Sequence, residues 1–122
     1  MKVDLSKKRI GRIINYKLDK IIKLDISWND LTELPDWINE CINLQELHCD
    51  NNKLKKLPTT LPNSLQKLHC NHNELKELPT TLPNSLQYLN CGYNKLKELP
   101  TTLPNSLQYL NCDNNELITS SL

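Results

Sequence analysis

The sequence predicts an α/β solenoid, in which successive repeats stack and their short strands join into one parallel sheet. Three observations predict this fold. The stretch LPNSLQ recurs every 21 residues, apolar and polar positions alternate within each copy, and prolines recur in the segment between copies. A fixed period of roughly 20–50 residues is typical of stacked repeats, because a single repeat cannot bury its own apolar face.

The repeating unit reads Leu-x-x-Leu-x-Cys-x-x-Asn-x-Leu-x-x-Leu-Pro. Copies open at Leu44, Leu65, Leu86 and Leu107, and the last of them stops before its proline. An earlier copy opens at Ile21, which precedes Leu44 by 23 residues. The sequence therefore predicts repeats that start near residues 21, 44, 65, 86 and 107.

Residues 1–20 are the least regular part of the chain. Val3, Leu5, Ile10 and Ile13 match the apolar positions of a partial repeat, and Lys8 stands where the asparagine is expected. This partial repeat joins the later ones without a linker, so the sequence predicts a single domain over residues 1–122.

The strand of each unit lies in its Leu-x-x-Leu-x-Cys segment. Successive side chains of a strand point to opposite faces. Leu47 and Cys49 are therefore expected to face inward, and Glu46 and His48 outward. Equivalent strands of about six units then lie side by side at a spacing of about 4.8 Å.

One asparagine recurs in the turn after each strand. Its side-chain amide both donates and accepts hydrogen bonds, so it can pair with backbone groups that the turn would bury. The sequence therefore predicts a buried asparagine ladder with a structural role. The ladder positions are Asn29, Asn52, Asn73, Asn94 and Asn115.

Prolines restrict the segment that returns from one strand to the next. Pro58 and Pro62, with their equivalents in the next two units, fix φ and remove backbone donors. Extended or 3-10 segments are therefore expected on this side of the stack. Residues 36–42 lack proline, and the sequence predicts one short helix there with Ile38 and Cys41 facing inward.

The unit resembles the motif of the leucine-rich repeat family, L-x-x-L-x-L-x-x-N/C-x-L, and the match runs from Val3 to Leu117. The short proline-containing units look like those of bacterial effector and giant-virus leucine-rich repeat proteins. The longer unit, LPDWINECINLQEL, looks more like the intracellular repeats of eukaryotes. The resemblance implies a right-handed, curved solenoid. Its strands line the concave side, where many family members bind partners, and 3-10 or extended segments form the convex side.

The composition limits the classes of partner. The chain has 122 residues, 5% aromatic residues, no Phe, and a net charge of +1 with both signs interspersed. Its one basic run, Lys7-Lys8-Arg9, is short, so no nucleic-acid partner is expected. The sequence has no apolar run of about 18 residues and no signal peptide after Met1, so no membrane partner is expected.

The cysteines indicate the compartment. The chain has five, an odd number, and four of them occupy one inward position of the repeat. We interpret Cys49, Cys70, Cys91 and Cys112 as inert core residues, because buried cysteine acts as a small apolar side chain. A reducing, intracellular location in the cytoplasm is therefore expected. For a secreted effector or a viral protein this would be the host cytosol.

The sequence assigns no metal site, no other cofactor and no catalytic residue, so the chain is interpreted as a protein that is not an enzyme. His48 and Cys49 are neighbours, but strand alternation places one outward and the other inward, so they cannot bind one ion. A weaker alternative is a surface metal site of His48, His69 and His72. With only Gly11 and Gly92, the chain has no glycine-rich phosphate loop.

The outward strand positions and the turns after them form the candidate docking surface. Tyrosine, tryptophan and histidine offer large contact areas with polar tips, which suits binding surfaces. The chain is therefore interpreted as a protein–protein interaction module with a protein partner. The candidate partner-binding residues are Lys23, Asp25, Trp28, Glu46, His48, Lys67, His69, His72, Tyr88, Asn90, Tyr93, Tyr109 and Asn111.

Three alternatives stay open at this point. In the first, the outward face is simply solvated and has no partner. In the second, the chain is a self-assembling structural module, such as a homodimer that pairs through uncapped terminal repeats, since exposed strand edges template pairing with another chain. In the third, the chain is a metal- or redox-responsive protein built on the histidine and cysteine positions.

Overall fold

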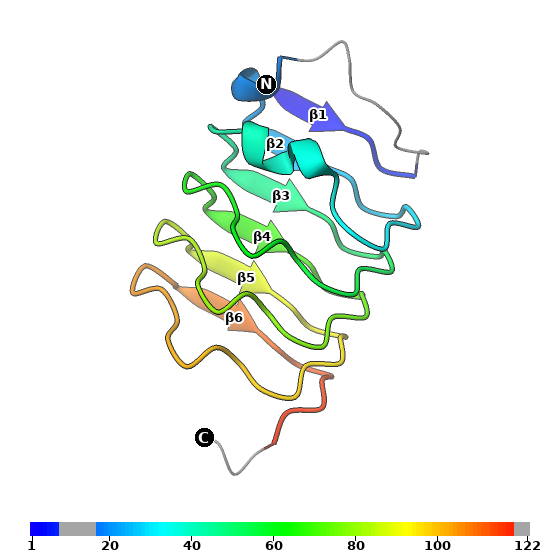
Figure 1. Cartoon of the computed structure of the whole chain (residues 1–122), viewed down its shortest axis with the longest axis vertical. Coiled ribbons are helices and arrows are strands. Elements are labelled where there is room, and N and C mark those ends of the chain that lie inside the picture. The colour runs from blue at the N-terminus through cyan, green and yellow to red at the C-terminus, as the bar shows by residue number, and fades with distance from the viewer. Residues whose placement is uncertain (8–16, 119–122) are drawn as a thin grey trace.

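Residues 1–7 and 17–118 are described by the computed structural model (Figure 1). One parallel sheet contains six strands in chain order, each paired with the next. This arrangement confirms the predicted solenoid. The strands are β1 (Lys2–Asp4), β2 (Lys23–Asp25), β3 (Glu46–His48), β4 (Lys67–His69), β5 (Tyr88–Asn90) and β6 (Tyr109–Asn111).

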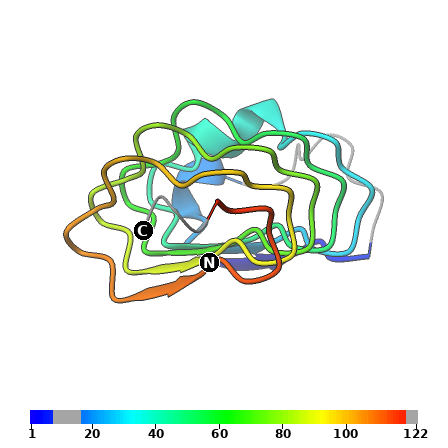
Figure 2. The same cartoon turned by 90° about the horizontal axis from the view of Figure 1, so that it is seen from below.

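The strands pair without any offset, so equivalent residues of successive units face each other. Leu24 pairs with Leu47, which pairs with Leu68, and the series continues to β6. These central leucines point into the core, and Leu24, Leu47 and Leu68 are completely buried. Seen along the stack, the turns follow one another as nested loops, with the sheet on one side and the return segments opposite it (Figure 2).

The first strand lies where the sequence predicts the start of a partial repeat at the N-terminus. Val3 pairs with Leu24 and is buried. The other expected positions of that repeat, Ile10 and Ile13 with Lys8 in place of the asparagine, lie outside the described residues.

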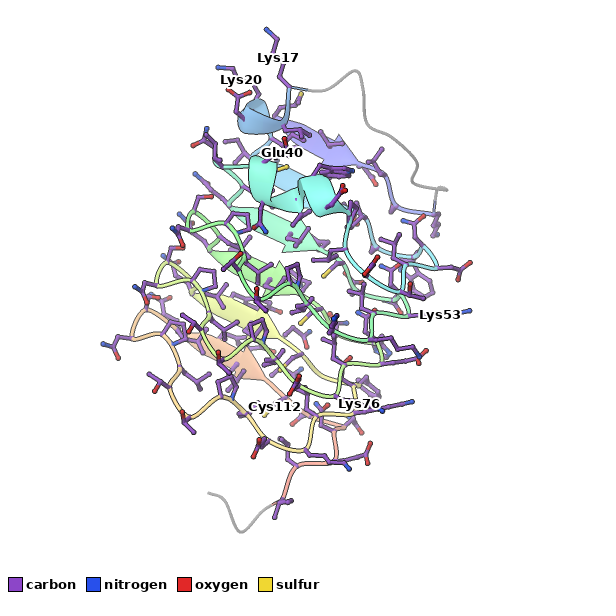
Figure 3. All side chains as sticks on the ribbon, in the orientation of Figure 1. Lys17, Lys20, Glu40, Lys53, Lys76 and Cys112 are labelled. Carbon is purple, nitrogen blue, oxygen red and sulfur yellow. The ribbon has the colours of Figure 1, made fainter. Side chains whose placement is uncertain are left out.

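Two short 3-10 helices interrupt the return segments. η2 (Asp36–Glu40) is the predicted short helix, and Ile38 and Cys41 are buried as expected. η1 (Leu18–Lys20) was not predicted, because no periodic signal marks three residues. Within residues 1–7 and 17–118 no helix has the length and apolar character needed to cross a membrane. Charged side chains such as Lys53 point away from the stack (Figure 3).

The asparagine ladder holds neighbouring units together. The Asn73 side-chain amide donates to the carbonyls of Cys49 and Cys70, both at 3.1 Å, and its oxygen accepts from the Leu54 N–H at 3.0 Å. One side chain therefore bonds its own turn and the preceding unit at once. Asn52 and Asn94 repeat this pattern and are likewise buried. The predicted structural role of the ladder is confirmed.

A second series of hydrogen bonds between units runs through the Asn-Ser-Leu turns. The hydroxyl of Ser85 donates to the carbonyl of Leu65, and that of Ser106 donates to the carbonyl of Leu86, at 2.6 and 2.7 Å. Ser64 bonds the Leu44 carbonyl in the same way. Each serine thus links the start of its strand to the start of the preceding strand.

The residue before each ladder asparagine, and Lys7 at the equivalent position of the first unit, adopt a left-handed backbone conformation. In the described part of the chain these φ values lie between 53° and 57°, and none belongs to glycine. Asparagine visits this region readily, whereas bulky side chains are strained there. The left-handed residues are Lys7, Trp28, Asn51, His72, Tyr93 and Asn114.

The four repeat cysteines lie inside the stack, and all five cysteines are free thiols. Burial raises the pKa of Cys91 to about 12, and burial together with Glu40 raises the pKa of Cys41 to about 11. Burial also raises the pKa of Cys49 and Cys70. The thiolate is the reactive form, so burial and a raised pKa both support the interpretation of these cysteines as inert core residues. Cys112 differs because it is only half-buried.

Replacing Asn73 by Ala should lower the free energy of unfolding by about 3 kcal/mol. The substitution leaves the Cys49 and Cys70 carbonyls and the Leu54 N–H without their partner in a buried turn, and each unpaired buried group costs about 1–3 kcal/mol. Urea unfolding followed by circular dichroism measures the change. The exposed Asn84→Ala is the matched control and should change the free energy by less than about 0.5 kcal/mol. Equal losses in the two variants would contradict a structural ladder.

Iodoacetamide at pH 8 should label one cysteine quickly in the folded chain, and that residue should be Cys112. A pKa of about 12 leaves the Cys91 thiol about one part in ten thousand ionised at this pH, and burial blocks access as well. Peptide mass mapping identifies the labelled site, and Cys112→Ser should remove the fast reaction. Fast labelling of Cys49 or Cys70 in the folded chain would show that the core cysteines are not inert.

Candidate functional site

The predicted partner-binding residues form one surface, which we call the concave face. Ten of them lie at the two ends of strands β2 to β6, on either side of the central leucine, which is buried in β2 to β5 and half-buried in β6. The other three, Trp28, His72 and Tyr93, lie at the left-handed turn position after β2, β4 and β5. The ten strand residues are Lys23, Asp25, Glu46, His48, Lys67, His69, Tyr88, Asn90, Tyr109 and Asn111.

A continuous row of four rings crosses the concave face from β3 to β6. The rings of His48 and His69 stack with centroids 4.0 Å apart, and those of Tyr88 and Tyr109 stack at 4.4 Å. The two pairs join through His69 and Tyr88, whose centroids lie 4.7 Å apart at an interplanar angle of 32°. The zero-offset register produces the two parallel stacks, because equivalent side chains lie directly opposite each other.

A second aromatic row follows the turns. His72 stacks on Tyr93 with centroids 4.3 Å apart. Trp28 occupies the equivalent position after β2. The exposed fractions of Trp28 and Tyr93 are 57% and 53%, so these rings present most of their surface to solvent.

The charged part of the face lies on β2, β3 and β4. Lys23 Nζ lies 3.3 Å from Glu46 Oε2, and the same oxygen lies 2.5 Å from His48 Nε2. Burial opposes ionisation of Glu46, but hydrogen bonds from His48 and Lys23 outweigh it and hold the pKa of Glu46 below its usual value. Lys67 faces Glu46 from the next strand. Opposite charges therefore alternate across these strands.

Two rings in the middle of the row, those of His69 and Tyr88, have shifted pKa values. Burial and the neighbouring His48 lower the pKa of His69, so its imidazole is mostly neutral. Burial and Tyr109 raise the pKa of Tyr88, so its hydroxyl stays protonated. The concave face thus changes from charged groups at β2 and β3 to neutral aromatic and amide groups at β5 and β6.

Three of the predicted site residues also stabilise the turns. The side-chain oxygens of Asp25, Asn90 and Asn111 accept from the backbone N–H two residues later, at 3.0, 3.1 and 2.9 Å. This Asx-type hydrogen bond closes the turn after the strand. At the same repeat position β3 and β4 carry His48 and His69, which have no side-chain carbonyl or carboxyl oxygen.

Glu46, His48 and His69 come together as the one group of three metal-capable side chains found in the described residues. Their ligand atoms all lie within 4.8 Å of one another, and each residue is half-buried. His72, the third member of the set weighed from the sequence, stacks on Tyr93 instead. The sequence analysis included Glu46 among the partner-binding residues but did not consider it as a metal ligand. Its position two residues before His48 places both side chains on one face of a strand.

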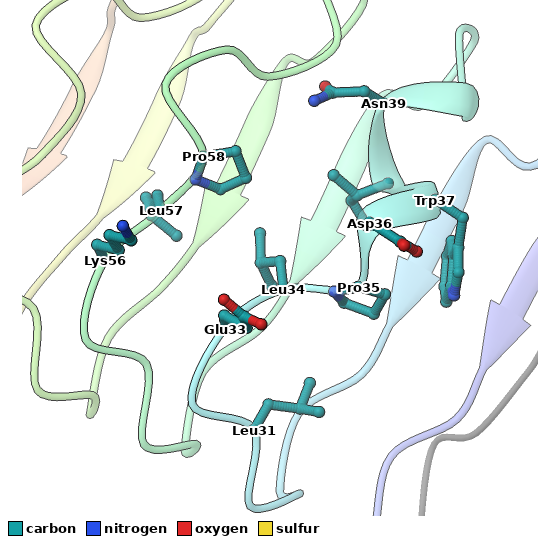
Figure 4. A pocket seen from close by; sticks show the side chains of 11 residues that line it. Leu31, Glu33, Leu34, Pro35, Asp36, Trp37, Asn39, Lys56, Leu57 and Pro58 are labelled. Atoms are coloured by element: carbon teal, nitrogen blue, oxygen red, sulfur yellow. The ribbon is translucent and has the colours of Figure 1, made fainter.

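The convex side has a hollow that the sequence did not reveal. A cavity of about 580 Å³ lies between η2 and the return segment of the following unit (Figure 4). Its lining comes from two successive units, so no single repeat reveals it. The 23-residue spacing between Ile21 and Leu44 is the sequence feature that marks the first of these units. The lining residues are Leu31, Glu33, Leu34, Pro35, Asp36, Trp37, Ile38, Asn39, Lys56, Leu57 and Pro58.

Comparisons with known proteins agree with this architecture. The family model described as Leucine Rich Repeat matches residues 20–41, 43–63 and 85–105. The oligodendrocyte-myelin glycoproteins of Homo sapiens and Mus musculus are each 35% identical over 63 residues. Those matches cover 52% of this chain, which spans only 14% of the length of each relative.

Solved structures match over most of the chain. The leucine-rich repeat domain of a Shigella effector superposes with a TM-score of 0.80 and 34% identity, covering 94% of this chain and 50% of that one. YopM, a leucine-rich effector protein from Yersinia pestis, superposes with a TM-score of 0.74 and 33% sequence identity, and the match covers 90% of this chain and 29% of YopM. The family match, the one-to-one parallel sheet and the asparagine ladder lead to one conclusion: the chain belongs to the leucine-rich repeat family.

Proposed function

We propose that the chain is a protein-interaction module, a single domain over residues 1–122, which docks a protein partner on the concave face. The row of four stacked rings across β3 to β6 carries this proposal. Aromatic side chains provide large contact area with few rotatable bonds, so they lose little conformational entropy when a partner binds. The leucine-rich repeat fold generally serves as a protein-interaction module, which supports the class of function.

The rigidity of the face supports docking. Three of the four rings project from strands whose central leucine is buried, Leu110 of β6 is half-buried, and the rings hold one another by stacking. A surface that is already ordered before binding loses less entropy on complex formation. The concave face therefore has the preorganisation that a docking surface needs.

Backbone strain also favours a binding role for the turn residues. Asn51 and Asn114 occupy the left-handed position comfortably, whereas Trp28, His72 and Tyr93 do so at a cost of roughly 1 kcal/mol each. Strained residues of this kind cluster at functional sites. Two of these three side chains are large and more than half exposed, and a partner would bury them.

The chemistry of the face indicates the kind of partner. Planar cations stack well on tyrosine, and arginine does so most often. We infer that the partner presents arginine or aromatic side chains to Tyr88 and Tyr109, and charged groups to Lys23, Glu46 and Lys67. The alternation of charge on β2 to β4 would set the register of the partner, since complementary charges favour one alignment over others.

We further propose that this interaction takes place inside cells, in the cytoplasm, or in the host cytosol if the chain is an effector or a viral protein. The free thiols of all five cysteines support a reducing compartment. The bacterial effectors among the solved relatives support the second location.

Self-assembly is the second candidate function. The leucines around the sixth strand, Leu107 and Leu110, are half-buried, whereas their equivalents Leu86 and Leu89 in the preceding unit are completely buried. Ile118 is 60% exposed. A second copy that covered these side chains and the free edge of β6 would bury apolar surface and pair a strand edge.

Replacing both Tyr88 and Tyr109 by Ala should weaken partner binding at least tenfold while the chain stays folded. Large aromatic residues at interface centres typically contribute about 2 kcal/mol or more when truncated. The loss of their mutual stacking should lower the free energy of unfolding by no more than about 1.5 kcal/mol. The partner is captured from a lysate with the unmodified chain and purified, and its Kd is then measured by titration calorimetry.

The matched control for this experiment is Thr80→Ala with Thr101→Ala. These exposed threonines belong to the return segments rather than to the concave face, and their loss should leave the Kd unchanged. A companion variant, Tyr93→Asn, should weaken binding without lowering stability, because asparagine suits the left-handed turn. A partner that binds the Tyr88/Tyr109 variant as tightly as the original chain would refute docking on the concave face.

Light scattering over a hundredfold range of concentration tests self-assembly. If the chain pairs through its last repeat, the mass should rise with concentration, and Ile118→Lys should abolish the rise because it buries a charge in the contact. Adding reductant should change nothing, since the thiols are free. A constant monomer mass would exclude this second candidate, and a dimer lost on reduction would contradict the inert cysteines.

A further inference from the structure

We propose that Glu46, His48 and His69 form a binding site for one divalent transition-metal ion, of which Zn²⁺ is the natural probe. The proposal rests on a geometry that joins two neighbouring strands. Glu46 and His48 lie two residues apart on β3, so strand alternation places both on the concave face. His69 pairs directly with His48 from β4. Both strands are internal to the sheet, so the three side chains project from a rigid support.

The distances are close to those that a metal requires. Two ligand atoms bound to one tetrahedral zinc at about 2.0–2.1 Å lie about 3.3 Å apart. His48 Nε2 and Glu46 Oε2 are now 2.5 Å apart, and all the ligand atoms lie within 4.8 Å of one another. One pair must therefore separate by less than 1 Å, and the others close by at most about 1.5 Å. Side-chain rotations achieve this without moving the strands.

The imidazole rings must reorient to bind one ion. They now stack with centroids 4.0 Å apart at an interplanar angle of 9°, and a metal lies close to the plane of each ring that binds it. The two nitrogen ends must therefore tilt toward each other, which replaces the stacking contact by coordination. Half-burial leaves room for this rotation, since 23% of the His48 side-chain surface is exposed.

The donor set selects the class of metal. Two imidazoles and one carboxylate favour zinc, copper or nickel over magnesium or calcium, which prefer oxygen ligands. Three protein ligands leave a coordination position open toward the solvent side of the face, which water would fill. The buried cysteines cannot supply a ligand, because their side chains lie on the opposite side of the sheet.

Nearby charges set an upper limit on the affinity. Lys23 bonds Glu46 at 3.3 Å, and Lys67 faces Glu46 from β4, so both ammonium groups repel a cation. Asp25 faces His48 from β2, and Asp50 lies near enough to His69 to influence it electrostatically. The carboxylates roughly offset the lysines. Replacing Lys23 should therefore raise the affinity for the metal ion, because the Lys23 ammonium group no longer competes with the metal for the Glu46 carboxylate.

Zinc chloride titrated into the metal-stripped chain and followed by calorimetry tests the site. All proteins in this experiment carry Cys112→Ser and are called the background protein and its variants, since the half-buried Cys112 thiol would otherwise compete for zinc. One zinc should bind per chain. His69→Asn and Glu46→Gln should each weaken binding roughly tenfold or more, and Lys23→Gln should strengthen it. The matched control is His72→Asn, whose side chain stacks on Tyr93 away from the cluster and should change the affinity less than about twofold.

Thermal unfolding provides an independent readout that does not depend on any partner. An ion that binds only the folded chain raises the melting temperature with concentration. Zinc should therefore raise the melting temperature of the background protein and of His72→Asn, but not that of His69→Asn. Absence of binding at millimolar zinc, or equal loss in His72→Asn and His69→Asn, would overturn the site. Failure of partner docking would leave the zinc titration unaffected, so the two proposals are decided separately.

Discussion

The side-chain amide of the ladder asparagine is the interaction on which the rest of the structure depends. It lies where the chain leaves a strand, and it bonds carbonyls in its own turn and in the preceding unit, as Asn94 does with Cys70 and Cys91. Its oxygen accepts a backbone N–H of the preceding return segment, that of Leu75. Without it the turn would bury several unpaired backbone groups, each at a cost of about 1–3 kcal/mol.

The one-to-one register follows from this ladder and determines the surface. Since equivalent positions lie opposite each other, any side chain that recurs in neighbouring units meets its own copy. Neutral rings tolerate this and stack, as Tyr88 does on Tyr109. Charged positions follow no single rule, because Lys23, Glu46 and Lys67 alternate in sign on β2 to β4, whereas Lys2 and Asp4 on β1 lie opposite Lys23 and Asp25.

The parts of the structure that repeat were predictable, and the parts that depend on differences between units were not. The strand positions, the inward cysteines and the asparagine ladder all follow from the 21-residue period of the sequence. The left-handed turn position escaped notice because its occupants, Trp28, Asn51 and Tyr93 among them, share no chemistry. The convex hollow lies between the return segments of two successive units, so no single repeat encodes it. The group of Glu46, His48 and His69 depends on two features at once, the two-residue spacing of Glu46 and His48 within β3 and the pairing of His48 with His69 between strands.

The position after the central leucine shows where structural and functional demands separate. On β1, β2, β5 and β6 an aspartate or asparagine there closes its own turn with a side-chain oxygen, as Asp4 and Asn111 do. On β3 and β4 a histidine takes this place, and the turn loses that hydrogen bond acceptor. The rings of His48 and His69 stack at 4.0 Å in place of that hydrogen bond. The turn preference is thus absent from two adjacent units, and these are the units whose histidines lie within 4.8 Å of the Glu46 carboxylate, which is the arrangement that the proposed zinc site requires.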